Sequence, residues 1–467
     1  ADAHTMQWIV EAYVVVLAAF TLIGGSLADR YGRRRCYAWG VTIFAAASVV
    51  CAVAVDAPGL IGGRLLQGIG GALLLPGGLA IIAACFSAQE RAVAIGSWAA
   101  FGAITGMAAP ALCGLLVEHS WRWIFLLNLP LAALTLTLLL LAVPESRDPD
   151  IDGPPDWAGG ALAALGLASL VAALLSWPRA GLSDAMVMAE LAGSAILLTA
   201  FYRVEKLAAA PMLPLTLFRE PLFAGINLAT LTLYTGLNGL MFFLPFTLIQ
   251  VRHFTPLETG LTMLPMGAAI FLLSRYAGRL VTRNPRLPLL LGPCLVAAAY
   301  LLLGHMGSSV TRWMQVAPAT LLLGTGMALC ISPISELALA AAPPGRAGVA
   351  SGVNNAVARI ASVLAIAALG AVLVVAFDRH LADALSRLEA SPSTLDHFAT
   401  EKRKLALAQA PENLPAARRQ VLNEAVQDAY LAGFRSLCQV AAALALLSAA
   451  ICYRTITVAG IPSERRE

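Results

Sequence analysis

Long apolar runs separated by short polar turns make up most of the chain. Thirteen of these runs approach the ~20 apolar residues that a helix needs to cross a bilayer. The pattern predicts an all-α polytopic membrane protein. The expected spans are 7–28, 38–56, 59–85, 93–117, 123–143, 157–177, 185–202, 222–250, 259–281, 287–306, 313–341, 348–377 and 430–453.

Composition supports this fold class. Of 467 residues, 59% are apolar and 12% are charged. Soluble domains average about 45–50% apolar residues and about 25% charged residues. The net charge of +4 is spread over the turns, so we expect no nucleic-acid partner. The eight cysteines lie mostly in apolar runs and lack metal-ligand spacing. We therefore expect no metal site and no bound cofactor.

The distribution of basic residues indicates which loops lie on the cytoplasmic side of the membrane and which lie on the outer side. The turn 29–35 carries four arginines, and short loops rich in Lys and Arg stay in the cytoplasm. Loops on the same side as this turn hold seventeen Lys or Arg, against four in the short loops opposite. We expect a multi-pass protein of a bacterial-type inner (plasma) membrane, with a cytoplasmic C-terminus. Thirteen spans would then leave Ala1 outside, so we expect one further helix before it and fourteen in all.

The longest loop, 378–429, falls on the outer side and contains seven basic and eight acidic residues. Apolar periodicity in 381–390 and 414–429 predicts short amphipathic helices that lie at the outer face. The segment 144–156 is acidic and proline-rich, and is expected to be a solvated linker. Whether the long loop is a cap or a partner surface is left open.

The chain contains an internal repeat. The segment 25–35 reads GSLADRYGRRR and the segment 278–286 reads GRLVTRNPR, with one glycine and two arginines at identical spacing. Asp29 of the first segment corresponds to Thr282 of the second. GIG at 68–70 and RAVAIG at 91–96 are echoed by GTG at 324–326 and RAGVASG at 346–352. Three echoes in one order predict a duplicated bundle, a property of many transporters.

These motifs resemble those of the major facilitator superfamily, and in particular its fourteen-helix drug:proton antiporter branch. The turn 25–35 resembles the motif between the second and third helices, and RLLQGIGGA at 64–72 resembles the fourth-helix motif. SWRWIFLLNLP at 120–130 and SGVNNAVAR at 351–359 resemble stretches of the sixth and penultimate helices. The segment 102–114 resembles the fifth-helix motif of antiporters, carried here by Gly102, Gly106, Pro110 and Gly114, with Ala109 and Cys113 where glycine is usual.

The resemblance implies two six-helix bundles with two helices inserted between them. The expected units are an N-terminal bundle (1–143), a linker with the inserted pair (144–221) and a C-terminal bundle (222–467). It also implies proton coupling, with the arginine of the fourth-helix motif, Arg64, involved. The acidic residue that the family usually carries on its first helix would precede Ala1.

Charged residues inside spans are functional candidates, because each costs at least about 2.5–3.5 kcal/mol to insert. Arg64 can set the pKa of a nearby carboxylate, or it can simply donate to backbone carbonyls. Glu11 can load protons from outside, or lie at the interface in reach of water. Glu336 is a proton relay, a site for a cationic substrate, or a structural carboxylate paired with Arg359.

Other polar residues complete the candidate sites. Glu190 lies on an inserted helix and is discounted, whereas Arg359 joins a polar stripe with Asn355. Amide, aromatic and thioether groups at helical spacing suit a broad amphipathic ligand, although ordinary helix packing is the better explanation for any single methionine or aromatic residue. The expected cavity residues are Gln67, Trp98, Phe101, Asn227, Tyr234, Asn238, Phe242, Met263, Met266 and Asn355.

The first basic turn is interpreted as a conformational latch that forms and breaks as the halves move. Asp29 near a helix start can accept backbone hydrogen bonds and pair with arginine. The alternative is a pure topology signal, which would leave Asp29 and the glycines unexplained. The expected latch residues are Gly25, Asp29, Arg30, Gly32, Arg33 and Arg34.

Together these features predict a proton-coupled multidrug efflux antiporter. It would export hydrophobic or amphipathic compounds, cations being one option, by alternating access and as a monomer. An exporter of an endogenous lipid or metabolite is the alternative. A lipid-modifying enzyme is a distant alternative, because the sequence shows no catalytic cluster.

Overall fold

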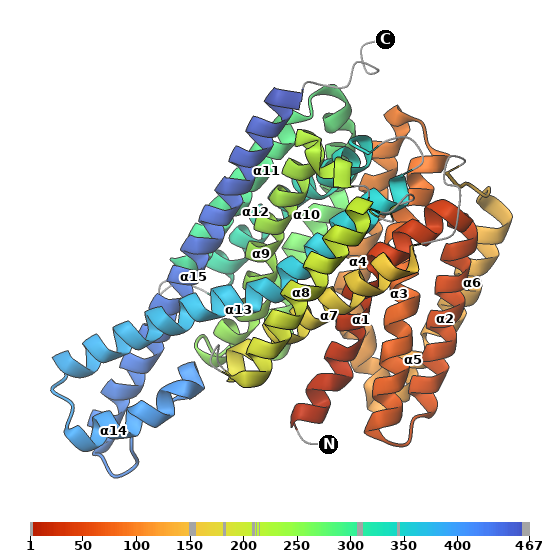
Figure 1. Cartoon of the computed structure of the whole chain (residues 1–467). Helices are drawn as coiled ribbons and strands as arrows, with labels where there is room; N and C mark the ends of the chain where they lie inside the picture. The colour runs from red at the N-terminus through yellow and green to blue at the C-terminus, as the bar shows by residue number, and fades with distance from the viewer. Residues whose placement is uncertain are drawn as a thin grey trace.

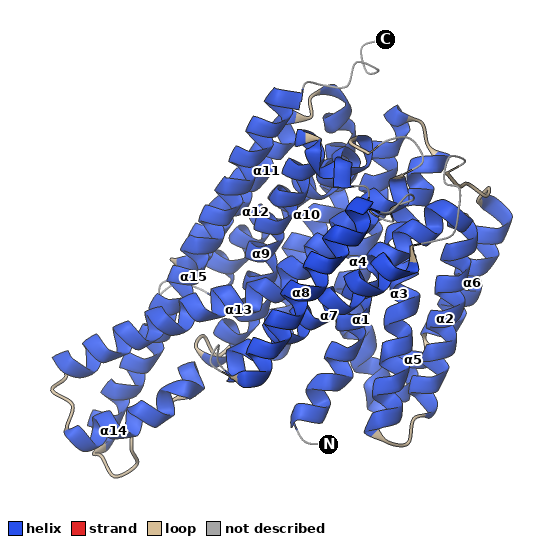
Figure 2. Ribbon diagram, in the orientation of Figure 1, coloured by secondary structure: helices blue, strands red, loops and turns tan. Residues whose placement is uncertain are grey.

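The computed structural model describes residues 3–148, 156–180, 184–207, 211, 213, 215–305, 312–342 and 346–459. All regular structure in these residues is helical (Figure 2). The all-α prediction is confirmed. Each of the thirteen expected runs falls on a helix, α5 and α6 together forming one run. Within the described residues, eleven helices are long and apolar enough to cross a membrane.

Two of the N-terminal helices begin at residues that cap them. Asp56 accepts a hydrogen bond from the backbone N–H of Gly59 at the start of α3, and Ser87 with Glu90 forms a capping box at the start of α4. These helices are α1 (Ala3–Tyr31), α2 (Arg33–Val53), α3 (Ala57–Cys85), α4 (Ala88–His119), α5 (Arg122–Leu126) and α6 (Asn128–Ala142).

The C-terminal helices share the largest buried apolar cluster, whose fully buried members come from this part of the chain. Tyr300, Tyr430 and Phe434 are among its largest buried side chains. The elements are α9 (Pro221–Gln250), α10 (Pro256–Arg283), α11 (Arg286–Gly304), α12 (Arg312–Ala340), α13 (Ala347–Arg387), α14 (Pro392–Glu401), the 3-10 helix η2 (Lys402–Leu407) and α15 (Ala416–Ala459).

The inserted elements are α7 (Trp157–Ala180), α8 (Ala185–Leu207) and the 3-10 helix η1 (Leu215–Arg219). Ala164 and Leu167 of α7 pack among residues of α1 and beside Ile360 of α13. Ala163 belongs to a cluster that includes Val349 and Val353 of α13. The inserted pair therefore lies along the seam between α1 and α13, as Figure 1 shows in yellow.

The segment 378–429 differs from the prediction of short helices lying on the outer face. Its two periodic stretches continue the long helices α13, of 41 residues, and α15, of 44 residues. At 1.5 Å per residue each is roughly 60 Å long, about twice a bilayer core. Figure 1 shows both helices running out to α14 as one projecting hairpin. Buried apolar residues such as Leu381, Phe398 and Leu422 hold its parts together.

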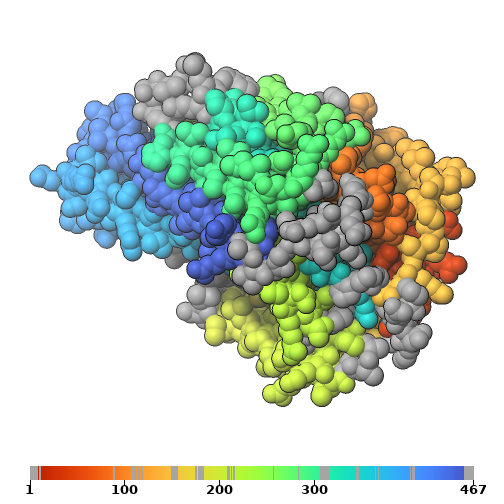
Figure 3. All heavy atoms as spheres, turned by 90° about the horizontal axis from the view of Figure 1, so that it is seen from above, coloured from red at the N-terminus to blue at the C-terminus, as the bar shows by residue number. Residues whose placement is uncertain are grey.

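Close helix crossings join the two halves at one end of the bundle, which we call the inner end. A Cβ at Gly25 of α1 would meet the carbonyl of Gly348 in α13, and one at Gly278 of α10 would meet the carbonyl of Ala92 in α4. Glycine at these positions permits close backbone approach. Figure 3 views this end, with the N-terminal half in red and orange beside the green and blue C-terminal half.

Candidate functional site

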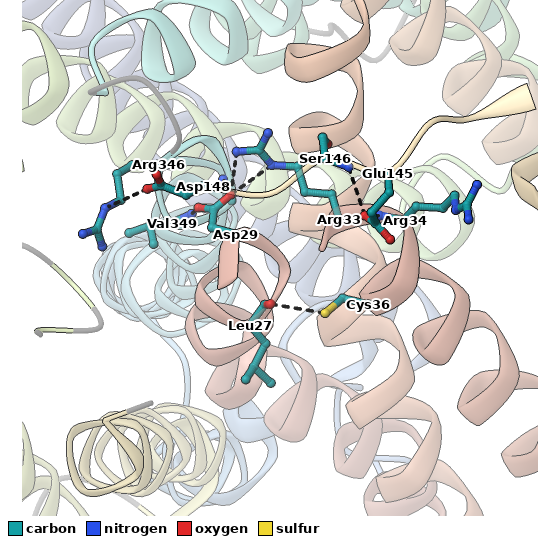
Figure 4. Close-up of polar contacts among 11 residues, drawn as sticks. Leu27, Asp29, Arg33, Arg34, Cys36, Glu145, Ser146, Asp148, Arg346 and Val349 are labelled. Atoms are coloured by element: carbon teal, nitrogen blue, oxygen red, sulfur yellow. Dashed lines mark hydrogen bonds and ion pairs between the residues drawn. The ribbon is translucent and has the colours of Figure 1, made fainter. Parts of the chain in front are cut away.

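Asp29 joins the last turn of α1 to the first turn of α13. Its carboxylate is fully buried. It accepts hydrogen bonds from the backbone N–H groups of Gly348, at 2.8 Å to Oδ1, and Val349, at 2.9 Å to Oδ2. These N–H groups belong to the first turn of α13, where they have no acceptor within the helix and where the helix dipole favours a negative charge. An acid of the N-terminal half thus caps a helix of the C-terminal half (Figure 4).

Arg33 holds the Asp29 carboxylate in place. Its Nε and Nη2 donate to Asp29 Oδ1 at 3.0 and 2.9 Å, and its side chain is itself 7% exposed. Gly32 makes the turn between α1 and α2 with a φ of 106°, a conformation that favours glycine. Arg34 donates through Nη1 to the carbonyl of Val143 at 3.1 Å, and Arg30 is half-buried beside this turn.

The segment after α6 completes this site, and the expectation of a solvated linker is wrong for its first residues. Glu145 accepts hydrogen bonds from the backbone N–H groups of Arg34 and Arg35 at 3.0 and 3.2 Å, which caps α2. The backbone N–H of Asp148 donates to the carbonyl of Asp29 at 2.8 Å. The buried side chain of Asp148 pairs with Arg346 at 3.4 Å, a second bond between the halves.

We call Asp29, Arg33, Glu145, Asp148 and Arg346 the inner latch (Figure 4). Sequence reasoning missed its last three members. For Glu145 and Asp148, the signal was a set of acidic side chains directly after the fifth run (123–143), on the side of the most basic turn. Thr282, the counterpart of Asp29 in the repeat, lies in α10, but its side chain is outside the described residues.

A second link between the halves joins α4 to α12. Arg91 donates through Nε and Nη2 to Glu336 Oε2 and Oε1, at 2.9 and 3.0 Å. The Glu336 side chain is fully buried. Ser332, one turn earlier, donates to the carbonyl of Ala92 at 3.0 Å. The pairing of Glu336 with Arg359 considered from sequence is therefore wrong. The start of α4 packs against α12, and this contact makes Arg91 the partner of Glu336.

Arg64 lies in a hydrogen-bonded network within the N-terminal half. It donates to the carbonyl of Ile9 at 3.0 Å and to Gln67 Oε1 at 2.9 Å, and its guanidinium stacks 4.7 Å from the ring centroid of Tyr13. Gln67 Nε2 then donates to Ser48 Oγ at 2.8 Å. The side chain of Glu11 is outside the described residues. The proton-coupling role of Arg64 and Glu11 stays a prediction.

Two of the expected cavity residues are buried in helix packing instead. Gln67 is 1% exposed and uses its amide within the Arg64 network. Asn227 is 4% exposed, donates to the carbonyl of Phe223 and accepts from Asn354. Each amide bonds both to its own helix and to a neighbouring helix, so neither lines open space in this structure.

The remaining cavity candidates keep some exposure. Tyr234 and Asn238 lie one turn apart on α9, and Asn238 donates to the Tyr234 carbonyl at 2.8 Å. Met263 and Met266 of α10 pack against the C-terminal core. Tyr234, Asn238, Met263, Met266 and Asn355 are half-buried, whereas Trp98, Phe101 and Phe242 are exposed.

The antiporter-type segment lies within α4. A Cβ added at Gly102 or Gly106 would meet open space, so neither glycine serves close packing in this structure. The surroundings of Pro110 and Gly114 are outside the described residues.

The arrangement of this chain matches known transporters. Residues 1–366 match the profile described as the Major Facilitator Superfamily. The chain belongs to the Major Facilitator Superfamily. It is 36% identical over 394 residues to the multidrug resistance protein Stp of Mycobacterium tuberculosis, covering 83% of this chain and 72% of Stp. It is 34% identical over 373 residues to the drug efflux pump JefA of the same species, covering 79% of this chain and 73% of JefA.

A solved structure supports the fold independently. The human organic anion transporter MFSD10 aligns with a TM-score of 0.61 at 16% identity, covering 95% of this chain and 83% of that protein. The fold class is that of superfamily transporters, which move solutes across membranes and are not enzymes. The protein is accordingly a multi-span membrane transporter.

Proposed function

We propose that this protein is a proton-driven exporter of hydrophobic or amphipathic drugs, working by alternating access in a bacterial inner membrane with the inner end in the cytoplasm. Support comes from the names of the relatives Stp and JefA, a multidrug resistance protein and a drug efflux pump. Arg33, Arg91 and Arg346 lie at the inner end, and an excess of basic residues is expected of a cytoplasmic face.

One observation carries the mechanism: the halves are joined at the inner end by breakable polar bonds. Asp29 caps α13 and Arg91 pairs with Glu336, each bond linking one half to the other. Closure at one end leaves access to a central site from the other end. Breaking these bonds would let the halves rock and expose the same site to the cytoplasm.

Protons are the expected energy source, and no bound cofactor is required. A carboxylate that binds a proton in one state and releases it in the other would link the gradient to the rocking of the halves. Arg64 is the proposed regulator of such a group, because a fixed guanidinium stabilises a nearby carboxylate until a proton arrives. A monomer suffices, since both halves lie in one chain.

The test is transport by the full chain in proteoliposomes under an imposed pH gradient. We expect dye or drug to accumulate against its gradient when protons flow the opposite way, and accumulation to stop when an ionophore collapses the gradient. Exchange of substrate that never moves protons would contradict proton antiport. Transport of lipid alone would favour the endogenous-lipid alternative.

A further inference from the structure

Arg359 is a membrane-embedded cation at the middle of α13. It lies twelve residues after Ala347, where α13 begins at the inner end. At 1.5 Å per residue this places it about 18 Å along the helix, near the centre of a ~30 Å bilayer core. A guanidinium at this depth is costly to bury and is expected to have a partner.

The described residues supply no such partner. Arg359 takes part in none of the hydrogen bonds or ion pairs found among them. The buried acids of the inner end are already used: Asp29 by Arg33 and α13, and Glu336 by Arg91. Glu190 lies on α8 of the inserted pair, and its side chain takes part in none of the ion pairs found among the described residues.

Arg64, another arginine within a span, differs in this respect. Arg64 has the Ile9 carbonyl, the Gln67 amide and the Tyr13 ring as partners. Its guanidinium is therefore held within the N-terminal half. Arg359 has no such bond to the described residues. The five N–H groups of a guanidinium form a planar fork that matches the two oxygens of an acidic group.

The surroundings of Arg359 suit the rest of an amphipathic molecule. Asn354 of α13 donates to Thr230 Oγ1 of α9 at 2.9 Å, so the two helices are in contact about one turn before Arg359 and Tyr234. The Tyr234 hydroxyl lies within electrostatic range of the Arg359 guanidinium. Asn355, one turn before Arg359, is half-buried and directs its amide nitrogen to Ser351, which leaves its oxygen as an acceptor. The half-buried aromatic ring of Tyr234 and the amide of Asn355 offer contacts to the remainder of such a molecule.

We propose that Arg359 binds the anionic group of the transported compound, so that acidic amphipathic compounds are preferred substrates. This inference rests on the proposed export function and narrows its substrate class. A carboxylate or sulfonate would supply the missing counter-charge, and its ring system would lie toward Tyr234 of α9. Neutral analogues would leave the guanidinium uncompensated, and cationic ones would be repelled.

The experiment compares three probes that share a fluorophore: dansyl-leucine, which is anionic, dansyl-leucinamide, which is neutral, and dansyl-cadaverine, which is cationic. Their Kd values are measured by fluorescence with the full chain in nanodiscs at neutral pH and without a gradient. For the unmodified chain we expect the anion to bind at least about tenfold tighter than the amide, because a charge-assisted hydrogen bond is worth that much. This comparison needs no variant.

Variants then assign the effect to one residue. Arg359→Gln should weaken binding of the anion at least about tenfold while binding of the amide is unchanged, and Arg359→Lys should keep part of the preference. Arg435→Gln is the matched control, since Arg435 of α15 donates to the carbonyl of Gly304 on the neighbouring α11. It should leave all three Kd values unchanged. Unchanged binding of the amide also verifies that Arg359→Gln has folded.

Equal affinity for the three probes, tighter binding of the cation, or an equal loss for anion and amide in Arg359→Gln would each overturn the inference. Proteoliposome transport separates it from the proposed function. If the anion is preferred but no probe moves under a pH gradient, the export proposal fails alone. If gradient-driven transport occurs without anion preference, only the role of Arg359 is refuted.

Discussion

Arg91 and Glu336, 245 positions apart in the chain, form a two-point ion pair at 2.9 and 3.0 Å between α4 and α12. The pair is unequal, because the Glu336 side chain is fully buried whereas that of Arg91 is 18% exposed. An arginine that loses its partner can turn toward water, but the buried carboxylate cannot. This ion pair links the two halves of the transporter. Glu336 needs Arg91 to compensate its buried charge, whereas Arg91 can be solvated without Glu336.

Arg91→Gln should therefore open the inner end more than Glu336→Gln does. Removing one member of a buried ion pair costs about 3–5 kcal/mol when the other remains uncompensated. Distances between spin labels at the exposed residues Phe86 and Leu287 report the opening. The double variant should open the end less than the sum of the single effects. Equal single effects would contradict the burial argument.

Asp29→Asn should slow transport at least about tenfold while leaving substrate affinity intact, because charge-assisted bonds to the start of α13 contribute about 1.5–3 kcal/mol each. Turnover in proteoliposomes and Kd in nanodiscs measure the two quantities separately. Thr282→Ala, at the corresponding place in the repeat, is the control and should change little. If affinity collapses in Asp29→Asn, the residue acts on the substrate site and not as a latch.

Gly25→Ala should impair transport, whereas Gly102→Ala should not. The added methyl at Gly25 meets the backbone carbonyl of Gly348, so α1 and α13 must separate, while the methyl at Gly102 meets open space. Overpacking of this kind costs about 1–3 kcal/mol. Transport rate and the spin-label distance are the readouts. A severe loss in Gly102→Ala would show that this glycine is packed in another state of the cycle.

Glu145→Ala should lower thermal stability, because Glu145 caps α2 through Arg34 and Arg35. Loss of a cap costs typically about 1 kcal/mol. Ser146→Ala is a suitable control, since Ser146 contributes its backbone carbonyl to Arg33 and keeps it after substitution. The melting temperature in detergent distinguishes them, and equal stability of both variants would contradict the capping role.

Arg64→Ala should uncouple proton movement from substrate movement. Loss of the guanidinium removes the charge that would hold a carboxylate ionised, so proton flux driven by substrate should fall about tenfold or more. Substrate exchange without net proton flow should persist. Unchanged coupling would assign Arg64 a structural role only, through its bonds to Ile9 and Gln67.

The fold class followed from local pattern, because a membrane span must be long, apolar and internally hydrogen-bonded. The helices α3 and α9 cover the expected runs 59–85 and 222–250 closely. The outer ends of α13 and α15 did not follow, because periodicity in 381–390 and 414–429 marks amphipathic helix without telling whether it continues a span. Packing around Phe398 and Leu422 made them parts of two long helices.

Some residues of the candidate site could likewise be predicted from the sequence, and others could not. Asp29, Arg33 and the glycines at 25 and 32 were recognisable, because an acid, several arginines and two glycines occur together in one short segment between apolar runs. Glu145, Asp148 and Arg346 were not, since their roles depend on a return of the chain after α6. Sequence also offered Arg359 as a partner for Glu336, and only the crossing of α4 with α12 assigned that place to Arg91.

By itself, the sequence determined that this chain crosses a membrane many times, that its halves repeat and that its basic turns share one face. These properties depend on residue types and spacing within short windows. Tertiary structure decided which charges meet across the halves, and that Arg359 has no counter-charge among the described residues. The reason is physical: the energy of a buried charge depends on what lies within a few ångströms, and those neighbours come from distant parts of the chain.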